Sequence, residues 1–223
     1  MRADDLDRLR ADRWFAAIAP ERQQRLVRRG RVRTLADGGR LCAIGDPPDG
    51  LYAVLEGDVR LVSNTAAGQE SVALMMGPGA WFGGLSAVDG GPRTHDAVAV
   101  GPSRVLHVAQ GDLDRATAED PLIWRELALL IAAYHRAATA VLAQTLTQPL
   151  MVRLARSLAA AARARPDEVL RLRQEELAAM HGVSRQTVNK ALKRLATAGM
   201  VEVAYGRIAV LDPARLRALG RKA

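Results

Sequence analysis

The sequence predicts an α+β protein with an N-terminal β-barrel or jelly-roll domain, a long helix and a C-terminal winged helix-turn-helix. Three observations support this prediction. Short apolar segments alternate with Gly, Pro and Asp turns from residue 31 to about residue 110, as in barrels and sandwiches. Apolar residues then recur at alternating spacings of three and four within 112–148, which is a helical pattern. Two helical segments separated by Gly182 then precede a hairpin pattern. The expected domains are 1–111, 112–148 and 149–223.

The composition is typical of a soluble globular protein, and the net charge favours a polyanionic partner. Of 223 residues, 49% are hydrophobic and 25% are charged, and the formal net charge is +8. Such a charge suits DNA, although an anionic membrane surface would attract it too. The single cysteine, Cys42, excludes an intrachain disulfide and a four-cysteine cluster. The charged start does not resemble a signal peptide, and no uninterrupted apolar run reaches about 18 residues. We therefore expect a cytoplasmic protein without a membrane partner.

The N-terminal segments are expected to form a small helical cap followed by the barrel. Residues 1–30 have the pattern of one or two short amphipathic helices broken at Pro20. Gly, Pro and Asp clusters then divide the chain into short apolar runs. The expected strands are Arg31–Leu35, Leu41–Ile44, Gly50–Glu56, Asp58–Asn64, Glu70–Met75, Thr94–Ala99 and Arg104–Ala109.

A glycine-rich stretch inside the barrel region has the residue types of an anion site. Gly83 and Gly84 would bring free backbone N–H groups to the start of a short helix, where anions bind. Arg93 and Thr94 could add a charged fork and a hydroxyl to the same anion. The alternative is that the glycines make a tight corner and that Arg93 is a surface residue.

The long helical segment carries a heptad stripe. Its members are Trp124, Leu127, Ile131, Tyr134, Ala138, Val141 and Thr145. Such a stripe on a helix between two domains predicts a parallel homodimer, although it could instead pack on its own barrel. The expected dimer-interface residues are Leu127, Ile131, Tyr134, Ala138 and Val141. Pro149 ends this helix, a new helix covers 150–164, and a short strand near 169–172 is expected to join the wing.

The C-terminal segment has the pattern of a DNA-binding helix-turn-helix. Gly182 allows the positive φ of a tight turn, and Ser184 is a candidate N-cap for the second helix. Val188, Ala191, Leu192 and Leu195 recur on one helical face. The wing is expected from Val201–Ala204 and Arg207–Leu211, with its turn at Tyr205-Gly206. The alternative is an ordinary helical hairpin with a solvated polar face.

The opposite face of the second helix carries side chains that suit base edges. Arg185 can donate to guanine, and Gln186 and Asn189 can pair with adenine, while Lys190 can bond a base or a phosphate. The expected DNA-binding residues are Ser184, Arg185, Gln186, Thr187, Asn189 and Lys190. Two such helices in a dimer would contact half-sites about one DNA turn apart, so the expected partner is double-stranded DNA with a palindromic operator.

The whole chain resembles the Crp/Fnr family of bacterial transcription regulators. The run from Gly39 to Arg60 resembles that family's sensor domain. Phe82–Leu85 with Pro92-Arg93-Thr94 resembles its phosphate-binding cassette, and Val183–Val188 resembles the start of its recognition helix. The resemblance implies an effector-controlled homodimer that acts with RNA polymerase. It also implies a cyclic nucleotide or another anionic small molecule as the ligand, and effector-binding residues Gly83, Gly84, Leu85, Arg93, Thr94 and Thr139.

Two positions depart from the family pattern. Members that bind cAMP have a glutamate for the ribose 2′-hydroxyl where this chain has Gly84, so cAMP is not the favoured effector. Gln186 replaces the common glutamate of the recognition helix, which favours adenine over cytosine at that position. A different anionic ligand, or no ligand, is an equal expectation.

Other classes of protein fit the sequence less well. The four histidines, His95, His107, His135 and His181, lie on different elements without the close pairing of metal sites. No nucleophile–base constellation is visible either, so we expect no catalytic residues, no metal site and no enzyme. The remaining alternatives are a haem or redox sensor using Cys42 with His95 or His107, and a nucleotide-binding adaptor with a degenerate C-terminus.

Overall fold

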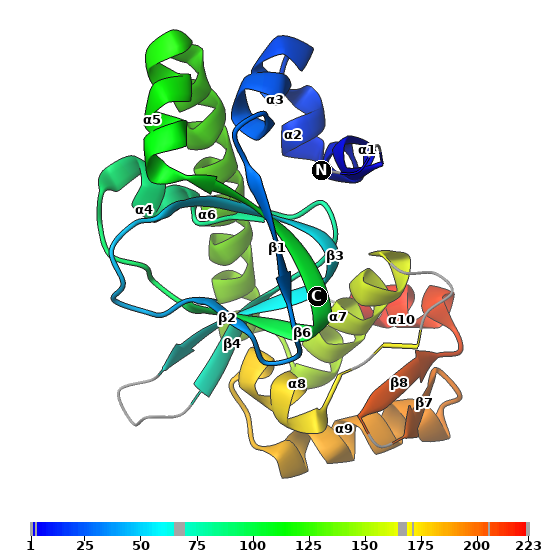
Figure 1. The fold of residues 1–223 in the computed structure, drawn as a ribbon. Coiled ribbons are helices and arrows are strands. Elements are labelled where there is room, and N and C mark those ends of the chain that lie inside the picture. The colour runs from blue at the N-terminus through cyan, green and yellow to red at the C-terminus, as the bar shows by residue number, and fades with distance from the viewer. Residues whose placement is uncertain are drawn as a thin grey trace. The chain divides into compact units, whose positions relative to one another are not determined.

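The computed structural model describes residues 2, 4–64, 70–164, 169–170, 172–204 and 206–221. Its internal contacts divide the chain into two compact units, Met1–Arg136 and Ala137–Ala223, and each unit is described by itself below (Figure 1). The long helix α6 (Leu122–Thr147) contains the point of division.

The N-terminal unit is built on a six-stranded antiparallel sheet with the main order β1-β6-β3-β4, in which β2 also pairs with β6 and β5 with β3. Its longest pairing joins β3 to β6, from Gly50 opposite Ala109 to Val62 opposite Asp96. The sequence pattern did not predict β5. The strands are β1 (Arg31–Leu35), β2 (Arg40–Cys42), β3 (Gly50–Asn64), β4 (Glu70–Met76), β5 (Trp81–Phe82) and β6 (Asp96–Ala109).

Each of the two long strands was expected as two separate strands, and that expectation is wrong. Gly57 in β3 has φ 76° and Gly101 in β6 has φ 72°, and the register shifts on both sides of Glu56. A Cβ at Gly57 would lie 2.4 Å from the Ser103 hydroxyl oxygen. Glycine therefore lets each strand form a bulge and continue at the position where the sequence pattern suggested a turn.

Three short helices precede the sheet, α1 (Asp5–Arg10), α2 (Arg13–Ala17) and α3 (Pro20–Val27), rather than one or two. Pro20 occupies the first turn of α3, where a missing N–H is harmless. The Asp12 carboxylate caps α2 by accepting from the backbone N–H groups of its first turn. Phe15 stacks on Trp81 with ring centroids 5.0 Å apart, so these helices share one core with the sheet.

The helical region expected at 112–148 is divided by Pro121 into α5 (Gln110–Glu119) and α6. Within α6, Leu127 is 0% exposed in the core of the N-terminal unit. Tyr134 donates its hydroxyl to the Trp81 carbonyl at 2.6 Å. Leu127 therefore has no surface left for a partner chain, which corrects its expected place in a dimer interface. The Tyr134 side chain is likewise engaged within its own chain.

By length and composition alone, helix α6 could also cross a membrane. The sequence contains no uninterrupted apolar run of about 18 residues, so this was not expected. Its most apolar window has a mean hydropathy of 1.3, and 17% of that window is buried. Ile123, Leu127 and Leu130 of this helix lie in the core of the N-terminal unit. Toward its C-terminal end, Val141, Leu142 and Leu146 are 58%, 60% and 77% exposed.

The C-terminal unit is a helix-turn-helix with a two-stranded wing. Ser184 caps the second helix by accepting from the Thr187 N–H at 3.2 Å, and Gly182 makes the turn with φ 64°. The strand expected near 169–172 is reduced to a bridge between Leu170 and Ile208, and the turn residue Tyr205 lies outside the described residues. The elements are α7 (Leu150–Ala164), α8 (Gln174–His181), α9 (Arg185–Thr197), β7 (Val201–Ala204), β8 (Arg207–Val210) and α10 (Pro213–Gly220).

Candidate functional sites

Helix α9 has one buried face and one exposed polar face. Val188, Ala191, Leu192 and Leu195 are at most 5% exposed and join the core of the C-terminal unit, as their spacing predicted. The DNA-binding residues expected on the other face are exposed except Asn189, which is half-buried. The exposed set is Ser184, Arg185, Gln186, Thr187 and Lys190.

Two of these polar residues have partners on α8 that the sequence reading missed. The Arg185 guanidinium lies 3.0 Å from the Glu175 carboxylate, with both side chains more than half exposed. The Asn189 amide donates to the Gln174 side-chain oxygen at 2.9 Å. An exposed ion pair contributes little free energy, so DNA can replace Glu175 easily. The half-buried amide pair instead fixes how Asn189 is presented.

His181 ends α8 with its ring inside the C-terminal unit, where it is 7% exposed. Burial, together with the nearby Arg153 cation, lowers the pKa of His181 to about 4. The ring nitrogen Nε2 has no hydrogen-bond partner among the described residues. His181 is therefore a neutral core residue at physiological pH.

The N-terminal unit brings Gly83, Gly84 and Arg93 together, as the sequence pattern predicted. Gly83 has φ 88°, and a Cβ there would lie 2.5 Å from Arg93 Nη1 and 3.0 Å from the Gly50 carbonyl oxygen. Only glycine fits this position, because a side chain would displace the guanidinium. Helix α4 (Gly84–Asp89) follows directly.

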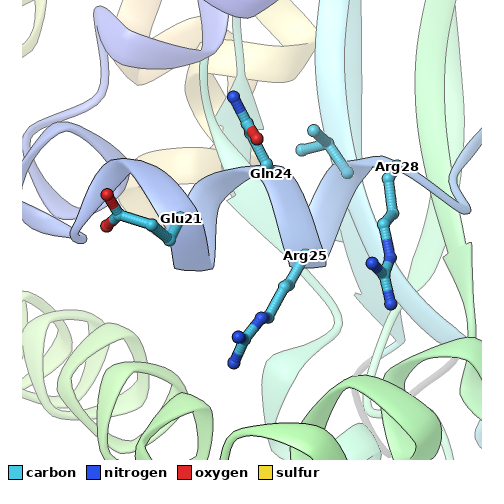
Figure 2. A pocket seen from close by; sticks show the side chains of 5 residues that line it. Glu21, Gln24, Arg25 and Arg28 are labelled. Atoms are coloured by element: carbon cyan, nitrogen blue, oxygen red, sulfur yellow. The ribbon is translucent and has the colours of Figure 1, made fainter.

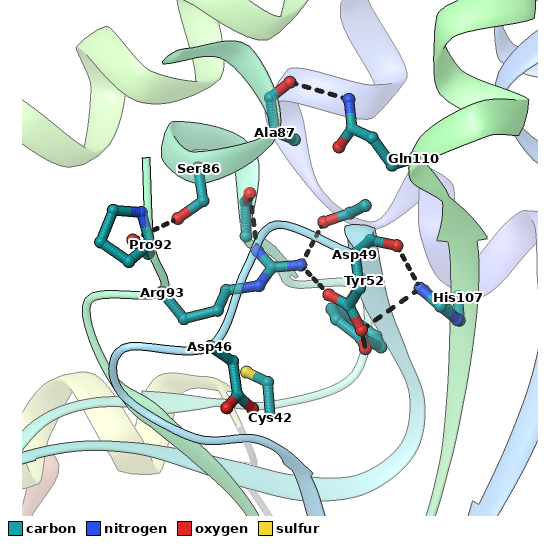
Figure 3. Close-up of polar contacts among 12 residues, drawn as sticks. Cys42, Asp46, Asp49, Tyr52, Ser86, Ala87, Pro92, Arg93, His107 and Gln110 are labelled. Carbon is teal, nitrogen blue, oxygen red and sulfur yellow. Dashed lines mark hydrogen bonds and ion pairs between the residues drawn. The ribbon is translucent and has the colours of Figure 1, made fainter. Parts of the chain in front are cut away.

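Arg93 is an interior residue, so its reading as a surface side chain is wrong: it is 4% exposed. Its guanidinium donates to the Gly83 carbonyl at 2.9 Å and to the Gly50 carbonyl at 2.6 Å. It also forms a close ion pair with the carboxylate of Asp49 (Figure 3). The cation expected to bind an effector is therefore already paired with an anion of the chain itself.

Asp49 belongs to a polar and aromatic cluster that sequence reasoning missed. Burial alone would raise the pKa of Asp49, but hydrogen bonds from Tyr52 and Arg93 outweigh it and lower the pKa. Burial and the Asp49 carboxylate together raise the pKa of the Tyr52 phenol. The Tyr52 ring stacks between Phe82 and His107, with centroids 5.3 Å and 4.4 Å away.

The other expected effector residues differ in their surroundings. Gly84 is buried, and the three atoms nearest to a Cβ placed there would be side-chain carbons of Leu130, Leu51 and Ile131, at 3.5 to 3.8 Å. Leu85 is 46% exposed, and the Thr94 hydroxyl contacts His95 Nδ1 at 2.8 Å. Thr139 lies on α6 in the other unit. Gly84 itself therefore supplies no side-chain acceptor for a sugar hydroxyl, and its nearest described neighbours are apolar.

Two further features of the chain were candidates for a site. Among the described residues, no group of three or more His, Cys, Asp or Glu side chains could hold a metal ion. A hollow on α3 is lined by Glu21, Gln24, Arg25, Val27 and Arg28 (Figure 2). Its arginines are already neutralised, since Arg25 pairs with Asp120 at 3.2 Å and Arg28 with Glu119 at 2.5 Å. These pairs hold α3 against the end of α5.

Comparison with known proteins places both units in one family. The family model described as "Cyclic nucleotide-binding domain" matches residues 32–120, and the one described as "Crp-like helix-turn-helix domain" matches residues 152–219. The Cyclic AMP receptor protein of Thermus thermophilus is 32% identical over 91% of this chain and 94% of its own length. The CRP-like cAMP-activated global transcriptional regulator of Mycobacterium tuberculosis is 30% identical over 91% of this chain and 93% of its own.

The solved structures agree with the sequence relatives. A transcriptional regulator of the CRP/FNR family from Thermus thermophilus superposes with a TM-score of 0.73 at 28% identity, covering 86% of this chain and 99% of its own. A sheet domain of the cyclic-nucleotide-binding type and a winged helix-turn-helix define the class of DNA-binding transcription regulators. The chain belongs to the Crp/Fnr family of that class.

Proposed function

We propose that this chain is a homodimeric regulator that recognises a palindromic DNA operator through α9. The proposal rests on the exposed edge of α9, where Arg185, Gln186 and Lys190 are accessible to solvent. The residues of the opposite face of this helix are each at least 95% buried. A helix held this firmly presents its N-terminal side chains in a fixed geometry, as major-groove recognition requires. The proposed DNA-binding set remains Ser184, Arg185, Gln186, Thr187, Asn189 and Lys190.

We propose that the partner chain of the dimer covers a stripe of α6 that is shifted around the helix by one residue from the expected stripe. With Leu127 and Tyr134 engaged in their own unit, the exposed or half-buried positions with the same three-and-four spacing run from Ala128 to Thr145. Ile131 and Ala138 stay in this stripe, and Leu142, 60% exposed, is its most exposed large apolar member. Val141, 58% exposed, flanks it. The revised stripe consists of Ala128, Ile131, His135, Ala138, Leu142 and Thr145.

We further propose that an anionic small molecule, of which a cyclic nucleotide is one candidate, binds at Gly83, Gly84, Leu85, Arg93 and Thr94. The two curated relatives above carry cAMP in their names. In this chain Gly84 has no side chain that could accept from a ribose 2′-hydroxyl, and its nearest described neighbours are apolar. A second candidate function is a regulator that needs no effector. The Asp49–Arg93 ion pair favours it, because Asp49 already neutralises the charge of Arg93.

The missing sugar acceptor leads to a specific prediction about nucleotide binding. If the chain binds cAMP, then 2′-deoxy-cAMP should bind within about twofold of it, because no hydrogen bond to the 2′-hydroxyl is lost. Calorimetric titration of the two nucleotides checks this. A tenfold or larger preference for cAMP would show that another group accepts from the ribose.

The regulator assignment is tested by selecting bound duplexes from a random DNA pool with the full chain. We expect an enriched inverted repeat whose half-site centres lie about one helical turn apart. A chain ending at Gln148 should stay dimeric and lose all enrichment. Selection of a consensus by the truncated chain, or of none by the full chain, would contradict the proposal. We place this activity in the cytoplasm, with RNA polymerase as the partner through which it acts.

A further inference from the structure

Arg93 is enclosed in the N-terminal unit, whereas its carboxylate partner is partly exposed. The Arg93 side chain is 4% exposed and the Asp49 side chain 40% exposed. Two backbone carbonyls, of Gly83 and Gly50, hold the guanidinium. Asp49 lies in the loop before β3, and its side chain stays partly exposed while it pairs with the guanidinium. Rotation of the Asp49 side chain into water would therefore uncover the cation without moving the backbone that holds it.

The pair also leaves part of the guanidinium unsatisfied. Arginine presents five N–H donors, and its Nη atoms here supply Gly83, Gly50 and Asp49. The Arg93 Nε atom is buried and has no hydrogen-bond partner among the described residues. One Asp49 oxygen bonds the guanidinium, while the other accepts from the Tyr52 hydroxyl. An anion with several oxygens can satisfy Nε and Nη2 together, which this carboxylate does not do.

Neighbouring groups position the Asp49 carboxylate beside Arg93. Tyr52 donates its hydroxyl to Asp49, and the Arg93 guanidinium carbon lies 5.5 Å from the centre of the Tyr52 ring. His107 Nε2 is 2.8 Å from the Asp49 backbone oxygen, and its ring stacks on Tyr52. The loop, the aromatic stack and the cation thus form one connected arrangement (Figure 3).

We propose that Asp49 is a built-in counter-anion of the effector site, and that a phosphate or phosphodiester ligand binds by displacing it from Arg93. The inference rests on the proposed effector site and adds its regulation. A competing internal anion lowers the apparent affinity for ligand by the fraction of time that the site is open. It also requires that a ligand offer more than one oxygen to the guanidinium, which a phosphate does.

The proposal is tested by calorimetric titration of the full chain with cAMP, cGMP and inorganic phosphate, comparing the wild type with Asp49→Asn. Asparagine keeps the shape and removes the charge. We expect the variant to bind at least one of these probes about tenfold more tightly than the wild type, since displacing a neutral amide is easier than displacing a paired carboxylate. A gain for inorganic phosphate alone would support the displacement and assign the site to a small oxyanion.

The matched control is Asp46→Asn, which removes the same charge from the same loop. Asp46 directs its carboxylate to the Ala43 N–H rather than to the guanidinium, so its change should alter affinity by less than about twofold. Arg93→Gln, added to Asp49→Asn, should abolish the gain. Asp49→Ser serves as a second opening variant if the asparagine chain has a lowered melting temperature.

The inference is overturned if Asp49→Asn and Asp49→Ser bind every probe as weakly as the wild type, or more weakly, or if Asp46→Asn gives the same gain. Failure here is distinct from failure of the regulator assignment, because the DNA selection needs no ligand. A chain that selects an inverted repeat but shows no gain on opening Asp49 is a regulator whose Asp49 does not gate the site.

Discussion

At the scale of single residues, the buried His181 links the stability of the C-terminal unit to pH. His181 ends the first helix of the motif, and its ring is enclosed by the same core that supports α9. A histidine that is buried in its neutral form is hard to protonate in the folded state, so the folded state loses stability in acid. The unfolded chain takes up its proton near pH 6.5, while the folded chain resists until about pH 4.

This difference in pKa predicts how stability changes with pH. The unfolded state binds more protons between pH 6.5 and 4, so stability contributed by neutral His181 is present above pH 6.5 and is lost as pH falls through that window. Between pH 7 and pH 5 the loss is about 2 kcal/mol. We expect His181→Gln to remove this part of the pH dependence. Urea unfolding of both chains at pH 7 and pH 5, followed by circular dichroism, measures it; parallel pH dependences would contradict the assignment.

Gln174 is predicted to act on base preference through Asn189. Its side-chain oxygen accepts from the Asn189 amide, which fixes the face that Asn189 presents to a base. We expect Gln174→Ala to broaden the preference at one base position per half-site and to leave melting temperature and binding to random duplex nearly unchanged. Duplex selection with both chains tests this, and Gln174→Glu, which keeps an acceptor oxygen, should restore much of the preference. An unaltered consensus for the alanine variant would show that Asn189 is positioned without Gln174.

Local sequence signals predicted some site residues and could not predict others. Ser184, Gly182 and Gly83 were predictable because a cap or a positive φ depends on neighbours in the chain. Asp49 was not, because it meets Arg93 across 44 residues, and no spacing rule connects them. The same holds for Gln174 and Glu175, whose place at the start of a helix hid their contacts with α9.

At the scale of elements, periodicity predicted which helices and strands exist better than where they end. The buried stripe of α9, the wing strands and β1 were found where the pattern placed them. The bulges at Gly57 and Gly101 and the break at Pro121 changed the connectivity of β3, β6 and the expected long helix. Of the stripe expected on α6, Leu127 and Tyr134 are engaged within the N-terminal unit, because an apolar helix face can pack on a core as readily as on a partner chain.

The revised stripe on α6 predicts which leucines matter for dimerisation. Leu142→Arg places a charge in the proposed seam and should give a monomer at micromolar concentration. Leu129 is also exposed, at 41%, but lies outside the seam, so Leu129→Arg should leave the dimer intact. Sedimentation equilibrium of both variants distinguishes the two positions. A dimer that survives Leu142→Arg, or one that is lost with Leu129→Arg, would place the interface on another face.

At the scale of the whole molecule, the charge of the chain fits binding to a polyanion. A net charge of +8 per chain becomes about +16 in the proposed dimer, which attracts DNA through its phosphates. We expect DNA affinity to fall by at least about a hundredfold between 50 and 200 mM salt, because bound phosphates release counterions. Fluorescence anisotropy across this salt range measures the slope. Binding that is indifferent to salt would exclude the phosphate contacts that the proposal needs.

The most direct test compares how well the chain distinguishes its selected operator from random duplex before and after the edge of α9 is changed. The measured quantity is the ratio of the two dissociation constants at fixed salt. We predict a ratio of about a thousand or more for the wild type, close to one for Arg185→Ala combined with Gln186→Ala, and unchanged for Arg194→Ala, which removes the same charge from the far end of α9. A double variant that keeps the wild-type ratio would contradict recognition by this helix.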